Sequence, residues 1–216
     1  MPGSLRTVLL LFPAAVLALL LVLFFRLKAR EEPKQALAVK VLCTLVPVVL
    51  CLNGCIVTGY PGFWLLFAGL VCCLVGDAVI DGSLPAGTAA FLTGHGLFIA
   101  CFVTLRAPDP LALPVFLVLF ALTAFLFRRH LRSLKGPRLL FVLYAAVILA
   151  MLSLALTLPY RRYTLLMAGG ALAFTVSDLL LARGLLRGKS ASRVADVVSL
   201  SCYYAGLYLF ALSVWM

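Results

Sequence analysis

Residues 63–80 read FWLLFAGLVCCLVGDAVI, and this stretch decides the fold: it is long and apolar enough to cross a membrane, yet it contains Asp77. A second such stretch, residues 163–182, reads YTLLMAGGALAFTVSDLLLA and contains Asp178. A carboxylate at the centre of a membrane helix costs about 2.5–3.5 kcal/mol on insertion scales, so it persists mainly where it is paired or functional. Each aspartate follows a valine and a very small residue, which indicates one site rather than two unrelated substitutions.

The composition of the whole chain is that of a polytopic membrane protein. The chain has 216 residues, of which 65% are hydrophobic and 12% charged, and its mean hydropathy is +1.18. A soluble domain of this size could not bury so many apolar side chains. The formal net charge of +11 comes from Lys and Arg in short gaps between apolar runs, which is a topology signal and argues against nucleic-acid binding.

Eight apolar segments are long enough to span a bilayer. They are residues 5–25, 36–57, 62–81, 87–105, 111–128, 138–158, 163–183 and 194–215. The first is too long for the apolar part of a signal peptide and is followed by basic residues, so we expect it to be retained. Short gaps rich in Pro and Gly separate the others, which forces sequential helices to run antiparallel. The sequence therefore predicts one all-α integral membrane domain over residues 1–216, a bundle of eight transmembrane helices.

The distribution of basic residues predicts the orientation of this bundle. Thirteen of the 18 Lys and Arg residues fall in the gaps after the odd-numbered spans, and four fall on the opposite side. Basic loops stay in the cytoplasm, so both termini are expected on the non-cytoplasmic side, in the cell membrane if the source is bacterial. Lys40, the remaining basic residue, lies inside the second span.

This topology places polar side chains from five spans in the cytoplasmic half of the bilayer. The two aspartates approach the cytoplasmic ends of the third and seventh spans, and Lys40 lies at comparable depth in the second. His95 lies about 12 Å into the fourth span, and the tyrosine pair of the eighth span about 13–15 Å in. Polar groups in hydrocarbon need partners, so we expect them to line one pocket. The predicted site residues are Lys40, Asp77, His95, Asp178, Tyr203 and Tyr204.

Structural roles remain alternatives for these residues. Either aspartate could simply pair with Lys40 or with a tyrosine hydroxyl, and His95 could be a hydrogen-bonded core residue. Aligning Asp77 with Asp178 also matches Gly69 with Gly170, a short echo that would correspond to a parallel repeat of the two spans.

Other site chemistries have little support in the sequence. All seven cysteines lie in apolar runs without a CxxC pair, so they are interpreted as small hydrophobic residues and not as a disulfide framework. A catalytic zinc ion needs about three ligands, and the chain offers one intramembrane histidine, so no metal or other cofactor is predicted. Ser177 adjoins Asp178, but the Gly-x-Ser-x-Gly turn of a serine hydrolase is missing from the sequence.

From Lys40 to the C-terminus the chain resembles the YhhN-like lysoplasmalogenase family. The resemblance rests on five short motifs in the expected order: Ala38-Val39-Lys40, Gly76-Asp77-Ala78, AAFLTGH at residues 89–95, FTVSD at residues 174–178, and Tyr203-Tyr204-Ala205. In one respect the chain departs from the family. Many members carry a glutamine shortly after the paired tyrosines, where this chain has Gly206-Leu207-Tyr208. The loss of that amide puts the choice of substrate, or the activity itself, in doubt.

The resemblance implies an eight-helix membrane enzyme that hydrolyses the vinyl ether bond of a lysoplasmalogen, a lysophospholipid, to a fatty aldehyde and a glycerophospho-alcohol. Two buried carboxyl groups suit this reaction, because one can protonate the alkene carbon while the other steadies the resulting cation and activates water. Asp77 and Asp178 are therefore the expected catalytic residues, and the sequence does not decide which is the acid. Lys40, His95, Tyr203 and Tyr204 would bind the headgroup or tune the acids.

Two other function classes remain open. In a transporter, the same intramembrane charges would form a proton relay or a substrate site. In a lipid-binding or scaffold protein, they would hold a lipid or stabilise the bundle without catalysis. Release of aldehyde from a lysoplasmalogen by the purified protein would distinguish the enzyme from both.

Overall fold

The computed structural model of the chain describes the backbone of residues 3–133, 138–187 and 193–216, and the side chains of residues 11–128, 141–184 and 194–216. Over these ranges helices are the only regular secondary structure. Its eight helices are α1 (Gly3–Ala29), α2 (Pro33–Thr58), α3 (Pro61–Val79), α4 (Leu84–Leu105), α5 (Ala112–Ser133), α6 (Arg138–Leu156), α7 (Arg162–Arg187) and α8 (Arg193–Ser213). They correspond one to one with the segments predicted from the sequence.

Local sequence signals explain several of the helix ends. A proline occupies the first turn of α2, α3 and α4, where the missing backbone N–H would have had no partner within the helix. Gly59 ends α2 with φ 65°, a left-handed conformation that glycine adopts without strain. The Ser83 hydroxyl caps α4 by accepting a hydrogen bond of 3.4 Å from the Ala86 N–H.

Six of these helices are long and apolar enough to cross a membrane: α1, α2, α3, α4, α7 and α8. In α5 and α6 the described apolar parts are shorter, at Ala112–Arg128 and Phe141–Leu156. The chain is thus an all-helical, multi-pass membrane protein, whereas eight spans and the side of the termini stay predictions. Several basic residues used for the orientation have side chains or backbone outside the described residues, as does His130: Arg6, Arg129, Arg132, Lys135, Arg138, Arg187, Lys189 and Arg193.

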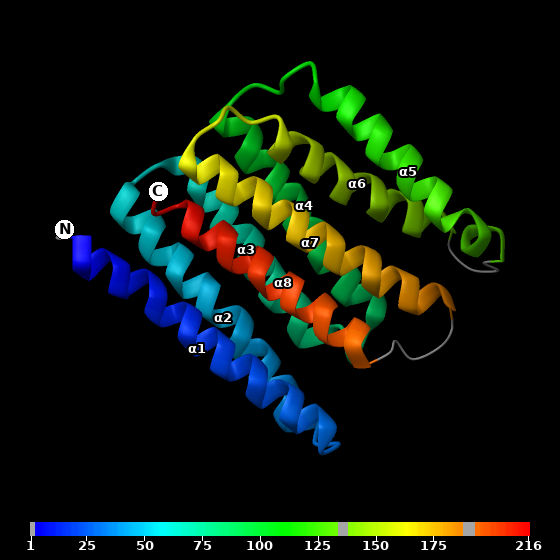
Figure 1. The fold of residues 1–216 in the computed structure, drawn as a ribbon, viewed down its shortest axis with the longest axis horizontal. Helices are drawn as coiled ribbons and strands as arrows, with labels where there is room; N and C mark the ends of the chain where they lie inside the picture. Colours follow the sequence, from blue (N-terminus) through cyan, green and yellow to red (C-terminus); the bar gives the residue numbers. More distant parts are fainter. Residues whose placement is uncertain (1–2, 134–137, 188–192) are drawn as a thin grey trace.

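The helices run back and forth along one direction, so both chain ends lie at the same end of the bundle (Figure 1). The helices α2, α3, α4, α6, α7 and α8 pack around the common core. At the edges, α1 packs mainly against α2 and also touches α8, while α5 packs mainly against α6 and also touches α7. The central helices therefore hold the predicted site residues, and the edge helices carry none of them.

The two halves of the chain pack in corresponding ways. A Cβ atom added to Gly94 of α4 would lie 3.0 Å from the carbonyl oxygen of Gly69 on α3. One added to Gly206 of α8 would lie 2.9 Å from the carbonyl oxygen of Gly170 on α7. Likewise, α2 packs against α3 and α8, and α6 packs against α7 and α4. The short sequence similarity between the third and seventh spans thus has a counterpart in the packing of α1–α4 and α5–α8, with both halves in the same orientation.

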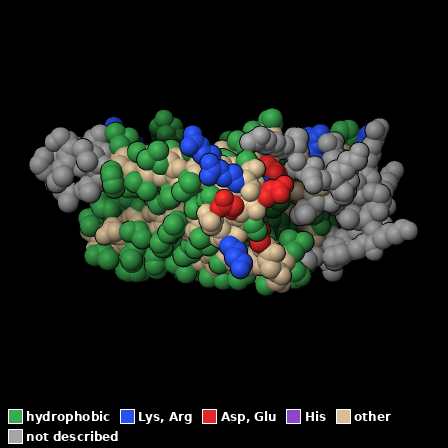
Figure 2. Space-filling view, turned by 90° about the horizontal axis from the view of Figure 1, so that it is seen from below, with side chains coloured by type: hydrophobic (Ala, Val, Ile, Leu, Met, Phe, Trp, Pro, Cys, Tyr) green, Lys and Arg blue, Asp and Glu red, His purple; other side chains and the backbone are tan. Residues whose placement is uncertain are grey.

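The exterior suits a lipid environment. Large hydrophobic side chains such as Phe12, Leu19 and Leu126 are exposed on the outer helix faces. In the space-filling view, hydrophobic side chains cover most of the visible described surface. The visible acidic side chains gather in a small area with several basic ones, and other basic side chains lie along the upper edge (Figure 2). A surface of this kind is stable in contact with lipid tails and would associate in water.

Candidate functional site

Asp77, in the last turn of α3, is surrounded by polar groups from two other helices. Its Oδ2 atom accepts a hydrogen bond of 2.7 Å from the Tyr203 hydroxyl of α8 and another from the Thr44 hydroxyl of α2. The Lys40 ammonium nitrogen, one turn before Thr44 on α2, lies 3.7 Å from Oδ1. The side chain of Asp77 is only 3% exposed. Two hydroxyl donors and one cation therefore surround one buried carboxyl group.

Lys40 links this buried group to the edge of the bundle. Its Nζ atom lies 3.5 Å from Oδ2 of Asp81, whose side chain is 61% exposed just beyond the end of α3. The backbone carbonyl of Lys40 accepts a hydrogen bond of 3.2 Å from the Tyr204 hydroxyl. The two adjacent tyrosines of α8 thus hold different parts of the group, Tyr203 the carboxyl of Asp77 and Tyr204 the backbone of α2.

Asp178, within α7, has a different set of neighbours. The Tyr144 hydroxyl of α6 donates a hydrogen bond of 2.6 Å to its Oδ2 atom. The Nε2 atom of His95 on α4 lies 3.7 Å from the same oxygen, which is too long for a hydrogen bond. The other ring nitrogen of His95 lies 2.6 Å from the Phe91 carbonyl oxygen. Among the described side chains, no Lys or Arg lies within 4 Å of Asp178, whose side chain is 12% exposed.

Aromatic side chains connect these two groups. The Tyr203 ring, whose hydroxyl holds Asp77, packs edge-on against Phe174 with centroids 5.2 Å apart. Phe174 also packs against His95, at 4.7 Å between centroids. The buried thiol of Cys73, one turn before Asp77 on α3, lies beside Gly94, the residue before His95 on α4. The carboxyl groups of α3 and α7 therefore face one continuous cluster of side chains.

The structure brings the predicted residues together in two adjoining groups. Lys40, Asp77, Tyr203 and Tyr204 form the first, and His95 and Asp178 belong to the second. The sequence prediction missed Thr44 and Tyr144, which donate to the two aspartates. A signal for Thr44 was present, because it lies four residues after Lys40 on the same helix face. For Tyr144 the sequence offered only its position, six residues into α6, as a sign that it belongs to the site.

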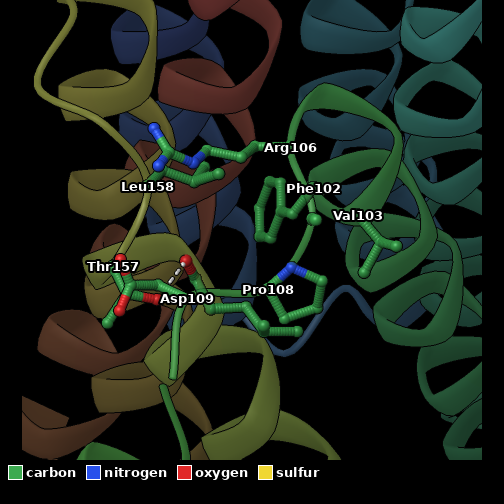
Figure 3. Close-up of a pocket in the computed structure, with 9 residues that line it drawn as sticks. Phe102, Val103, Arg106, Pro108, Asp109, Thr157 and Leu158 are labelled. Atoms are coloured by element: carbon green, nitrogen blue, oxygen red, sulfur yellow. Dashed lines mark hydrogen bonds between the residues drawn. The ribbon is translucent and has the colours of Figure 1, made fainter. Parts of the chain in front are cut away.

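Two pockets lie away from these groups, and neither is lined by a predicted site residue. One, at the far end of the bundle, lies between the end of α4 and the end of α6; there Arg106 extends towards Leu158, and Asp109 lies near Thr157 (Figure 3). The other is a hydrophobic groove between α5 and α6 that includes Phe120 and Phe141. In the described residues, no cluster of three or more His, Cys, Asp or Glu residues could hold a metal ion.

Comparison with known proteins adds one finding to this geometry. A model of the YhhN family matches residues 35–214, which include both aspartates and all of α3 to α8. No curated protein and no solved structure matches the chain.

Proposed function

The chain belongs to the YhhN family, and from this premise we propose that it is a membrane-embedded hydrolase of lysoplasmalogen-type lipids. The substrate is a lysophospholipid with a vinyl ether bond, and the products are a fatty aldehyde and a glycerophospho-alcohol. One observation supports the proposal most: two largely buried carboxyl groups from α3 and α7 meet one cluster of side chains, but their immediate neighbours differ in charge. Acid–base catalysis by a carboxyl pair depends on such a difference.

The chemistry requires one proton donor and one proton acceptor. Protonation of the alkene carbon breaks an O–H bond of the acid, forms a C–H bond and leaves an oxocarbenium ion. Water adds to the cationic carbon and gives its proton to the second carboxylate, which produces a hemiacetal. The hemiacetal then collapses: its ether oxygen takes this proton, its hydroxyl proton returns to the first carboxyl group, and the C–O bond breaks. Both groups are thus restored without a metal or another cofactor.

The substrate is an amphiphile, and the location of the two groups suits it. Lys40 and Asp81 connect the buried carboxyl of Asp77 with the exposed end of the bundle, where a headgroup would stay hydrated. Large apolar side chains, including Phe98, Phe174 and Phe210, pack against His95 or against one another and would adjoin a hydrocarbon tail. We expect the lipid to enter from the cytoplasmic leaflet, with its phosphate towards the basic loops.

The direct test is aldehyde release by purified protein in lipid nanodiscs. The substrate is a 1-alkenyl lysophosphoethanolamine, and the matched control is its 1-alkyl analogue, which has the same headgroup and chain but no double bond to protonate. Aldehyde should form from the alkenyl lipid only, and Asp77→Asn protein should form little. If wild-type protein leaves the alkenyl lipid intact over a range of headgroups, the proposed reaction is wrong.

A transporter is the second candidate, because α1–α4 and α5–α8 pack in corresponding ways and parallel repeats are common in transporters. Against it, α3, α4, α7 and α8 are continuous helices through Asp77, His95, Asp178 and Tyr203, whereas transporter sites often lie at breaks in helices. Proton-driven uptake of a lysolipid into proteoliposomes, without aldehyde release, would favour the transporter.

A further inference from the structure

The hydrogen bonds of His95 show where its proton is. Its Nδ1 atom lies 2.6 Å from the carbonyl oxygen of Phe91, and a carbonyl oxygen can only accept, so Nδ1 carries a hydrogen and donates. In a neutral imidazole the other nitrogen, Nε2, is then an acceptor. This Nε2 atom is buried and has no hydrogen-bond partner among the described residues. It faces Oδ2 of Asp178 at 3.7 Å.

The oxygen that Nε2 faces is also an acceptor. Oδ2 of Asp178 already accepts the Tyr144 hydroxyl hydrogen. If Asp178 were ionised and His95 neutral, two lone pairs would oppose each other inside the bundle, and both would lack a proton to share. One additional proton on this pair removes the conflict. It can lie on the carboxyl group or on the imidazole.

Burial favours the carboxyl group as the holder of this proton. With the proton on His95, the pair would be two ions away from water, and a buried ion pair is favourable only with close geometry and additional hydrogen bonds. The separation of 3.7 Å does not provide that geometry, and Tyr144 is the one donor that Asp178 has among the described residues. Other titratable groups near Asp178 are Cys73 of α3 and Tyr144 of α6, and neither supplies a positive charge. A neutral carboxyl group beside a neutral imidazole avoids both ions.

Asp77 presents the opposite case. It accepts hydrogen bonds from Tyr203 and Thr44, and the ammonium group of Lys40 lies 3.7 Å away. Two hydroxyl donors and a cation stabilise a carboxylate and leave little reason for a proton on it. Lys40 also faces Asp81, so the three side chains together carry one positive and at most two negative charges.

We infer that Asp178 is held protonated as the proton donor of the site and that Asp77 is its ionised partner, with His95 and Tyr144 as positioning residues. The assignment of catalytic roles rests on the proposed hydrolase function, but the protonation states do not. In the reaction, the hydrogen of the Asp178 carboxyl group goes to the alkene carbon. The carboxylate of Asp77 takes the proton of the attacking water and delivers it to the departing ether oxygen. Asp178 recovers its proton from the hemiacetal hydroxyl, so both groups end each cycle as they began.

Infrared spectroscopy of the full-length protein without substrate tests the protonation states directly. A protonated carboxyl group has a C=O stretching band that shifts in D2O, and a carboxylate has separate bands at lower frequency. The wild-type spectrum minus that of Asp178→Asn should contain the protonated band, and the spectrum minus that of Asp77→Asn should contain carboxylate bands. Asp81→Asn, which removes one exposed carboxyl group, is the control. Carboxylate bands in the Asp178 difference, or a protonated band in the Asp77 difference, would overturn the assignment.

The positioning residues have their own spectroscopic readout. Tyr144→Phe removes one hydroxyl, and His95→Gln removes the ring while keeping a polar side chain. In each variant the band of the protonated Asp178 carboxyl group should persist, but at a different frequency, because the carboxyl group loses a neighbour. A band unchanged in both variants would refute their positioning role. If the wild-type protein releases no aldehyde although its infrared bands are as expected, the proposed reaction is wrong and the protonation states stand. The two failures are therefore distinguishable.

Discussion

The Lys40 ammonium nitrogen of α2 lies 3.7 Å from one carboxyl oxygen of Asp77 on α3, and both side chains are almost completely buried. Removing one partner of such a pair leaves the other as an uncompensated charge, whereas removing both does not. Pairing and catalysis can therefore be separated by mutation at these two positions.

Lys40→Met should lower the stability of the protein by on the order of 3 kcal/mol, because Asp77 stays buried without its cation. Adding Asp77→Asn should recover much of that stability, because Asn needs no counter-charge. Aldehyde release should stay low in the double variant. Thermal unfolding in detergent and the aldehyde assay measure the two effects. A double variant less stable than Lys40→Met would show that the pair is not the source of the loss.

The two aspartates should behave as a unit in catalysis. Asp77→Asn and Asp178→Asn should each reduce the rate by at least about 100-fold, the contribution typical of acid–base catalysis, and the double variant should be little worse. Asp196→Asn is the control, because Asp196 forms an ion pair with Lys28 and none with the residues of either group among the described residues. Rates near wild type in either single variant would rule out a two-carboxylate mechanism.

The contact of α7 with α8 should be sensitive to one methyl group. In Gly206→Ala, the new Cβ atom would lie 2.9 Å from the Gly170 carbonyl oxygen and 3.1 Å from the Phe174 nitrogen, so the helices must separate. Gly96→Ala makes the same change where no atom outside its own turn lies within 4 Å. We expect Gly206→Ala to lower the melting temperature, and Gly96→Ala to leave it unchanged or raise it, since alanine favours a helix. Equal melting temperatures would contradict the close contact.

The orientation predicted from the basic residues can be read by thiol labelling in intact cells. Lys34 and Tyr160 are exposed at opposite ends of the bundle, in the first turn of α2 and between α6 and α7. A membrane-impermeant reagent should modify Tyr160→Cys directly and Lys34→Cys only after permeabilisation. Wild-type protein, without an introduced cysteine, is the control for labelling of the seven native cysteines, of which five are buried. The reverse pattern would place both termini in the cytoplasm.

The sequence predicted the helices well because proline, glycine and charge mark the gaps between apolar runs, and few other arrangements of such runs are stable in lipid. It also predicted which polar residues lie at a similar level along the bundle, since position along a helix follows from the rise per residue. It could not predict which helices adjoin. The helices are apolar on most sides, so their rotation is determined by packing, such as that of Gly69 on Gly94, and not by an amphipathic pattern.

Because the sequence did not predict which helices adjoin, it did not predict all the residues of the site. Tyr144 matters because α6 packs between α7 and α4, and nothing in its own sequence shows this. For the same reason, the sequence could not decide which aspartate adjoins Lys40. The packing of α2 against α3 decides it, and the difference between the two carboxyl groups follows from that contact.

The corresponding packing of α1–α4 and α5–α8 has an evolutionary consequence. Fusion of two copies of a four-helix protein, once associated as a symmetric dimer, would produce this arrangement, and an even number of helices per copy keeps both copies upright. In such a dimer both aspartates would have had identical neighbours. Within one chain, each copy could mutate alone, so one aspartate could gain a lysine and the other a histidine and a tyrosine. Gene fusion would thus have allowed two equivalent carboxyl groups to acquire different roles.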